Sequence, residues 1–121
     1  MSLSDRLADL LAVRGVQSAA VASLEGFVVE AAGPASGAAD ELAGRVAAAL
    51  ASSRALAELF GDGDLRQATI EFEGGPVLLL PLPEPALEHV AVVVLDELAS
   101  LGRARLALRR VLPELAEAVT A

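Results

Sequence analysis

The sequence predicts an α+β fold (an α/β sandwich) in which helices flank a five-stranded, mainly antiparallel sheet. Three segments place apolar residues at the helical period, and five shorter apolar segments are bounded by Gly, Pro and acidic residues. Most of the predicted strands are joined by tight turns, which connect antiparallel neighbours. The order is α-β-β-α-β-β-β-α, and residues 1–121 are predicted to form a single domain.

The first part of the chain is predicted to be a helix followed by a β-hairpin. Ser2 or Ser4 can cap the helix, and Gly15 is expected to end it. Residues 18–24 and 27–32 are short apolar runs separated by a Glu-Gly turn, which favours a hairpin. The buried side of the helix is formed by Leu3, Leu7, Leu10 and Leu11.

The stretch from Leu42 to Phe60 is predicted to be a long central helix that is apolar on two sides. One side is expected to face the sheet, and the opposite side carries small, mostly uncharged residues. Two interpretations of the small side remain open: contact with a second copy, or an Ala-rich surface that tolerates exposure. The sheet-facing side consists of Leu42, Val46, Ala49, Leu50, Ser53, Leu56, Ala57 and Phe60. The small side consists of Gly44, Ala48, Ala51, Ser52, Ala55 and Leu59.

Residues 65–73 show the clearest strand alternation in the chain. Arg66, Ala68, Ile70 and Phe72 fall on one face, which is mostly apolar and is expected to lie on the core. The other face is mostly polar, so we expect it to be solvated or shared with a partner. The turns on either side of this strand are predicted at Gly61-Asp62-Gly63-Asp64 and at Gly74-Gly75.

The last part of the chain contains two buried strands and a helix. Residues 77–80 are uniformly apolar, as expected for a strand that is covered on both faces. Residues 87–95 are predicted to form a fifth strand, with residues 90–95 buried on both sides. The final helix follows residues 96–98, and Pro113 within it removes one backbone donor, which predicts a kink. Its buried stripe consists of Leu101, Ala104, Leu108, Val111, Leu112, Leu115 and Val119.

The composition argues against several classes of partner. The net charge is −8 and there is no Lys, so the chain should repel the phosphates of nucleic acids and anionic membrane surfaces. The absence of Trp and Tyr removes the aromatic platforms on which single-stranded nucleic acids stack. An acidic domain of this kind would instead be steered towards a protein partner with a basic face, although the charge can also serve solubility alone.

The sequence also lacks the features of a secreted or membrane-inserted protein. Its N-terminus carries acidic residues early, which is unlike a signal peptide, and there is no Cys for a disulfide framework. No uninterrupted apolar run reaches the roughly 18 to 20 residues that a membrane span requires. We therefore expect a cytoplasmic protein without direct membrane insertion.

Catalytic chemistry finds little support in the sequence. His89 is the only histidine, and no second His or Cys accompanies it as a metal ligand. No serine lies in a G-x-S-x-G elbow, and the glycine-rich turns carry acids, which would repel phosphate. The sequence therefore predicts no catalytic, cofactor-binding or metal-binding residues, and we expect that the protein is not an enzyme.

One basic cluster stands out on the final helix. Arg105, Arg109 and Arg110 are close in sequence, and Arg110 can pair with Glu114 one helical turn later. A solvated, ion-paired helix face is one interpretation of this cluster. The other is a contact site for an acidic partner.

Three stretches resemble the roadblock/dynein light chain family, and especially its bacterial, MglB-like branch. The first runs from Val13 to Glu30 and contains the predicted hairpin. The second runs from Leu65 to Leu82 with Gly74-Gly75 in its turn, and the third runs from Leu101 to Leu115. The resemblance covers nearly the whole chain and rests on hydrophobic and turn positions rather than on a catalytic motif.

The resemblance implies a dimer in which two five-stranded sheets join edge to edge, with the central helices packed beside the seam. It further implies a non-enzymatic platform that binds and regulates a small Ras-like GTPase, either as an activator or as a passive scaffold. A homodimer is expected, although a heterodimer with a paralogue is an alternative. We expect the dimer interface to contain Gly44, Ala48, Ala51, Ser52, Ala55, Leu65, Gln67, Thr69 and Glu71.

Two other functions remain as alternatives. A ligand-sensing or signalling scaffold module without a GTPase partner could share this arrangement of sheet and helices, but a sensor would need a roomy pocket. An enzyme would need a base and a nucleophile that the sequence does not bring together. Loss of a catalytic turnover in His89→Ala would favour the second alternative.

Overall fold

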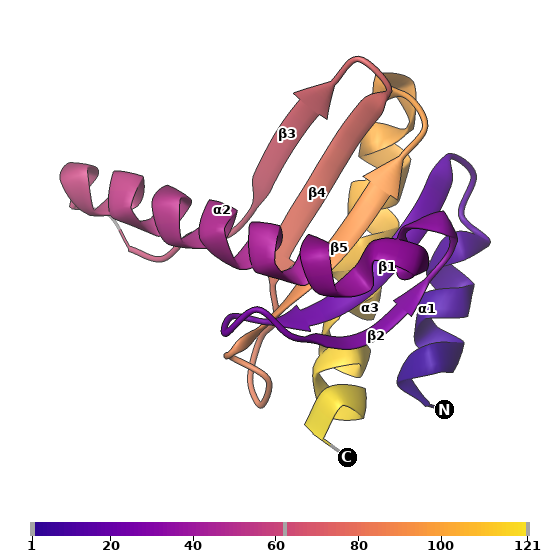
Figure 1. Cartoon of the computed structure of the whole chain (residues 1–121), viewed down its shortest axis with the longest axis horizontal. Coiled ribbons are helices and arrows are strands. Elements are labelled where there is room, and N and C mark those ends of the chain that lie inside the picture. Colours follow the sequence, from indigo (N-terminus) through magenta and orange to yellow (C-terminus); the bar gives the residue numbers. More distant parts are fainter. Residues whose placement is uncertain (1, 62, 121) are drawn as a thin grey trace.

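The computed structural model describes residues 2–61 and 63–120 and confirms the predicted α+β fold. The sheet order is β2-β1-β5-β4-β3, and every pair of neighbouring strands is antiparallel (Figure 1). The helices are α1 (Leu3–Leu11), α2 (Ala39–Phe60) and α3 (Leu101–Thr120), with 3₁₀ turns at Pro34–Ala38 and Leu98–Ser100. The strands are β1 (Val16–Ser23), β2 (Val28–Ala32), β3 (Ala68–Phe72), β4 (Gly75–Pro81) and β5 (His89–Leu95).

The sheet forms the middle of three layers. Helices α1 and α3 cover one face, and α2 crosses the other (Figure 1). Each face has its own buried apolar cluster, so both interfaces between sheet and helices are filled with side chains. The larger cluster includes Leu7, Val21, Leu78, Leu80, Val93, Leu108 and Leu115. The α2 cluster includes Ala20, Ala43, Val46, Leu50, Leu79, Val90 and Val92.

Helix α1 begins with a capping box. The Ser2 hydroxyl accepts from the Asp5 backbone N–H at 3.1 Å, and the Ser2 backbone N–H donates to the Asp5 carboxylate at 3.0 Å. The backbone hydrogen bond from Ser2 is the main reason that the pKa of Asp5 lies below its usual value. The prediction that Gly15 ends this helix was wrong, because α1 ends at Leu11 and Gly15 lies in the turn before β1.

The two predicted hairpins are present, with one shift in position. The Glu25-Gly26 turn joins β1 to β2 as expected. The second turn consists of Glu73 and Gly74 rather than Gly74 and Gly75, since Gly75 already pairs with Phe72 as the first residue of β4. The third strand is shorter than residues 65–73, and the fifth begins at His89 rather than at residue 87.

Helix α2 extends beyond the sheet. It ends at Phe60 and is capped by Gly61, which has a left-handed conformation (φ 68°). Asp62 of the predicted turn lies outside the described residues. The buried residues of α2 are Ala43, Val46 and Leu50, and no residue from 51 to 60 is buried. The prediction that the apolar stripe packs on the core along its whole length was therefore wrong for Leu56 and Phe60, which are 57% and 73% exposed.

The apolar face of β3 is also more exposed than predicted. Ile70 pairs with Val77 and Ala68 with Leu79, so these residues point to the face of the sheet that α2 crosses. Ile70 is nevertheless 38% exposed and Phe72 is 55% exposed. The physical reason is that β3 is an edge strand and α2 does not cover its far end (Figure 1).

Helix α3 runs without interruption through Pro113, so the predicted kink stays a prediction. Glu114 does not pair with Arg110; its carboxylate lies 2.9 Å from the Arg6 guanidinium and so connects α3 to α1. Within residues 2–61 and 63–120, none of the helices combines the length and hydrophobicity needed to cross a bilayer.

Candidate protein–protein interface

The free edge of β3 is the first component of a candidate interface. The sheet ends at β3 on one side and at β2 on the other. An exposed edge strand presents unpaired backbone groups that can pair with another chain. Of the predicted interface residues, Thr69 and Glu71 are exposed on this strand, while Leu65 and Gln67 are half-buried in the extended segment before it.

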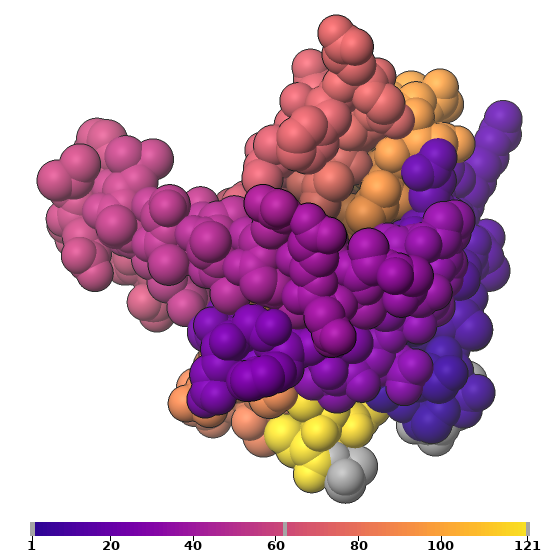
Figure 2. Space-filling view, viewed as in Figure 1, coloured from indigo at the N-terminus to yellow at the C-terminus, as the bar shows by residue number. Residues whose placement is uncertain are grey.

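An apolar notch lies between β3 and the projecting end of α2. We define the notch by four exposed apolar side chains, two from each element. The open angle between the two elements is visible in Figure 2. The two side chains from α2 continue the apolar stripe with which this helix packs on the sheet. The two from β3 lie on the face of the sheet that α2 crosses. The notch consists of Leu56, Phe60, Ile70 and Phe72.

The length of α2 explains why its apolar stripe continues beyond the edge of the sheet. A helix of 22 residues is about 33 Å long at 1.5 Å per residue. Five strands at about 4.8 Å spacing span only about 19 Å between the outer two. The excess of about 14 Å corresponds to roughly nine or ten helical residues, which matches the stretch after Leu50 in which no residue is buried.

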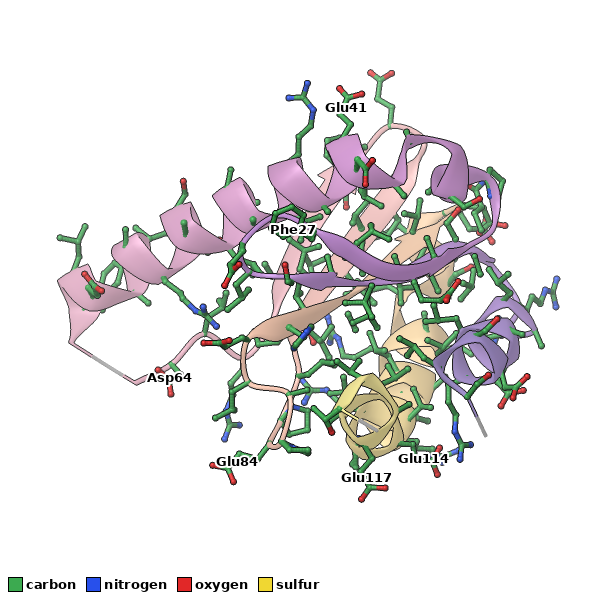
Figure 3. The ribbon with its side chains drawn as sticks, turned by 60° about the horizontal axis from the view of Figure 1, so that its bottom comes forward. Phe27, Glu41, Asp64, Glu84, Glu114 and Glu117 are labelled. Atoms are coloured by element: carbon green, nitrogen blue, oxygen red, sulfur yellow. The ribbon has the colours of Figure 1, made fainter. Side chains whose placement is uncertain are left out.

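The small side of α2 has a different environment from the notch. None of its predicted interface residues is buried in the single chain, which is compatible with either interpretation of this side. These residues are Gly44, Ala48, Ala51, Ser52 and Ala55. Gly44 lies against the β1–β2 turn, because a Cβ placed on Gly26 would be only 3.6 Å from the Gly44 Cα. Phe27, the next residue of that turn, is 66% exposed and lies beside α2 (Figure 3).

The predicted arginine cluster of α3 does not act as one unit. The Arg109 guanidinium donates to the Gln67 side chain at 3.1 Å, and this bond connects α3 to the segment before β3. Arg105 is half-buried, and its Nε has no partner among the described residues. Arg110 is exposed. Only Arg109 is thus tied to the predicted dimer edge.

A hollow of about 560 Å³ lies where α2, the segment before β3, the β4–β5 connection and α3 meet. We call it the arginine groove, because three arginines from three separate elements line it. Figure 3 shows Asp64 of this segment beneath the projecting end of α2. The lining residues are Arg54, Asp64, Leu65, Arg66, Pro81, Leu82, Pro83, Leu87, Arg109, Leu112 and Pro113. Pattern reasoning missed this groove, because Arg54, Arg66 and Arg109 are far apart in the sequence.

Among the described residues, the remaining polar side chains form neither a recognisable catalytic site nor a metal site. His89 is half-buried at the start of β5, and its Nδ1 has no hydrogen-bond partner in the described part of the chain. Residues 2–61 and 63–120 contain no group of three or more His, Asp or Glu side chains arranged to hold a metal ion.

Comparisons with known proteins identify the family of the chain and agree on its fold. Residues 3–101 match the sequence model of the family described as the Roadblock/LC7 domain. The structure is similar to MglB of Myxococcus xanthus, with a TM-score of 0.84 and 21% identity over 95% of this chain and 92% of that one. It is also similar to the gliding protein mglB of Thermus thermophilus, with a TM-score of 0.83 and 25% identity over 98% and 88% of the two chains. An MglB structure with a tetrameric arrangement gives a TM-score of 0.84 and 25% identity over the same shares. Curated proteins gave no match.

Proposed function

Because the chain belongs to the Roadblock/LC7 domain family, we propose that it forms a homodimer that serves as a non-enzymatic platform for a small Ras-like GTPase and regulates its nucleotide cycle. The exposed apolar notch supports the dimer. The likeness to MglB structures supports the GTPase, since the MglB-like branch is the part of the family that the sequence resembles. An MglB with a tetrameric arrangement further favours self-association.

The observation that carries the dimer is the apolar stripe of α2 beyond the edge of its own sheet. Leu56 and Phe60 lie on the stripe that buries Val46 and Leu50, yet they have no strand beneath them. A second sheet placed edge to edge with β3 would supply the missing surface. Removing apolar area from water stabilises such a contact by about 25 cal/mol per Å² before the costs of association.

Two-fold symmetry fixes the direction of the edge pairing. A closed dimer uses the same surface on both copies, so β3 must pair antiparallel with β3 of the second copy. Phe72 and Gly75 flank a two-residue loop, and the residues that flank such a loop form a hydrogen-bonded pair. Along an antiparallel ladder, every second residue of a strand bonds to the same neighbour. We infer from this alternation that Thr69 and Glu71 direct their free N–H and C=O groups to the open edge.

The charges along β3 favour the same direction. Arg66 precedes the strand, whereas Glu71 and Glu73 lie at its end. Antiparallel pairing brings the basic start of one strand to the acidic end of the other. Parallel pairing would instead place like charges opposite one another, which destabilises a sheet.

The proposed seam therefore combines predicted and newly found residues. From the sequence prediction it keeps Leu65, Gln67, Thr69 and Glu71, and we add the four exposed side chains of the notch. The small side of α2 (Gly44, Ala48, Ala51, Ser52 and Ala55) stays an untested part of the predicted interface. One of its members, Gly44, faces the β1–β2 turn, so we favour the notch as the dimer contact.

Two substitutions in α2 distinguish these surfaces. Leu56→Arg places a charge in the notch, and we expect the dissociation constant of the dimer to rise about a hundredfold, equivalent to about 2.7 kcal/mol. Ala48→Arg adds the same side chain to a position on the small side that is not buried, and we expect less than about a threefold change. Sedimentation equilibrium measures both variants. A dimer that survives Leu56→Arg but dissociates in Ala48→Arg would instead assign the seam to the small side.

The platform proposal itself is tested by nucleotide-dependent binding. A small Ras-like GTPase should co-purify with the chain more strongly in its GTP-like state than with GDP, or the reverse. Equal recovery with both nucleotides would favour a passive scaffold over a regulator of the nucleotide cycle.

A further inference from the structure

The arginine groove concentrates positive charge on an acidic protein. The whole chain has a net charge of −8, with nine basic residues in total. Three of those nine line this groove, and among the described residues Asp64 is the one carboxylate in the lining, so the described lining carries a net charge of +2. Because like charges in one hollow repel each other, such a concentration is unfavourable unless an anion offsets it.

Within residues 2–61 and 63–120 of the single chain, the arginines of the groove are not paired with a carboxylate. Among the described residues, the salt bridges are Arg6 with Glu114 and Arg45 with Glu41. Arg54 and Arg66 therefore have no ion-pair partner in that part of the chain, and Arg109 contacts only the neutral Gln67 side chain at 3.1 Å. A guanidinium that is not engaged with a carboxylate can bind one from another molecule in a bidentate manner.

The walls of the groove are apolar and conformationally restricted. Seven of its eleven lining residues are Leu or Pro, with Leu82 buried at the floor and Leu65 and Leu112 half-buried beside it. The three prolines have a fixed φ and no backbone N–H. The restricted backbone lowers the entropy cost of binding, and the missing donors leave anion recognition to the arginine side chains.

We propose that the arginine groove binds a short, extended segment of a partner protein in which acidic side chains alternate with leucine or valine. The guanidinium groups bind the carboxylates, and the leucine and proline walls cover the apolar side chains between them. A nucleotide fits less well, because the three phenylalanines of the chain lie outside the lining and no Trp or Tyr is present to stack on a base. A bare inorganic anion would leave the apolar walls unused. The proposal goes beyond the platform function. Leu65 and Arg66 belong both to the groove and to the proposed seam, so the oligomeric state is measured together with peptide binding.

The test uses the full chain and a fluorescein-labelled peptide of sequence Glu-Leu-Glu-Leu-Glu, with Gln-Leu-Gln-Leu-Gln as the uncharged probe. Fluorescence anisotropy gives the affinity, and amide chemical shifts of the ¹⁵N-labelled chain locate the peptide. We expect shifts confined to the lining residues, weaker binding at higher salt, and at least tenfold weaker binding of the uncharged probe.

Charge-reversal variants decide whether the groove or the overall charge is responsible. Arg54→Glu should weaken binding by at least about tenfold, and Arg54→Gln, which only removes the charge, gives a second variant should the first unfold. Arg110→Glu is the matched control, because it makes the same change of charge at an exposed position outside the lining. Equal weakening by Arg54→Glu and Arg110→Glu, shifts outside the groove, or equal binding of both probes would overturn the proposal. Sedimentation of the same samples shows whether the dimer is intact, so failure here is separable from failure of the platform proposal.

Discussion

Ile70→Arg is expected to convert the dimer into a folded monomer. Ile70 lies in the middle of β3 on the face that α2 crosses, and it is already 38% exposed in the single chain. An arginine at this position can therefore remain solvated in the monomer, whereas the proposed dimer would bury its charge without a partner, at a cost of about 3–5 kcal/mol. Light scattering coupled to size exclusion should report a mass near the 12.3 kDa of one chain.

The matched control for this variant is Phe27→Arg. Phe27 is also a large exposed apolar residue, but it lies on the β1–β2 turn rather than in the notch. We expect Phe27→Arg to remain dimeric at the concentrations at which Ile70→Arg is monomeric. If the two variants dissociate equally, or if Ile70→Arg stays dimeric, the β3 seam is wrong.

Gly75→Ala is expected to lower the stability of the fold strongly, although it adds only one methyl group. Gly75 has φ of 127°, and an added Cβ would overlap the backbone oxygen of Leu95 and lie 2.8 Å from the carbonyl carbon of Asp96. Both the backbone strain and the clash with a neighbouring main chain oppose the change, so we expect a loss of at least about 3 kcal/mol in the free energy of unfolding. Thermal denaturation should show a midpoint lowered by roughly 10 °C or more.

Gly74→Ala is the control for that measurement. Gly74 is the preceding residue, in the turn before β4, but a Cβ there meets no atom of a non-neighbouring residue within 4 Å. We expect a change of less than about 0.5 kcal/mol in the free energy of unfolding. Similar midpoints for the two variants would show that the turn adjusts to a side chain at either position, contrary to the geometry.

The fold was predictable because its signals are local. The element order, the five strands and the three helices follow from periodicity and turn residues, and the structure confirms them. The buried runs at Leu78–Leu80 and Val90–Val93 were likewise visible as uniformly apolar segments. The family match over residues 3–101 agrees with the resemblance inferred from the same patterns.

The candidate site was harder to predict because it depends on the relative size of elements. Periodicity assigns Leu56 and Phe60 to the sheet side of α2, but it does not say whether a sheet lies beneath them. A comparison of the length of the predicted helix with the width of a five-stranded sheet predicts that the end of the helix extends past the sheet. A sequence pattern also gave no warning that Glu114 pairs with Arg6 rather than Arg110, because Arg6 belongs to a different helix.

The arginine groove was not predicted, because its residues are distant in sequence and only the fold brings them together. Its three arginines come from α2, from the segment before β3 and from α3, so no window of sequence contains them together. The only advance signal was Arg109 within the basic cluster of the last helix. The chain fold brings Arg109 to Gln67 and leaves Arg110 in solvent, which separates residues that are adjacent in sequence.

The most direct test of the platform proposal is affinity capture of partners from a lysate of the source organism. The tagged full chain is incubated with excess GDP or with a non-hydrolysable GTP analogue, and the bound proteins are identified by mass spectrometry. The Ile70→Arg variant, run in parallel, shows whether capture needs the dimer. We expect a small Ras-like GTPase to be enriched in one nucleotide state and reduced with Ile70→Arg. Recovery of no such GTPase in either state, with a paralogue or a membrane sensor recovered instead, would contradict the platform proposal and favour a signalling scaffold.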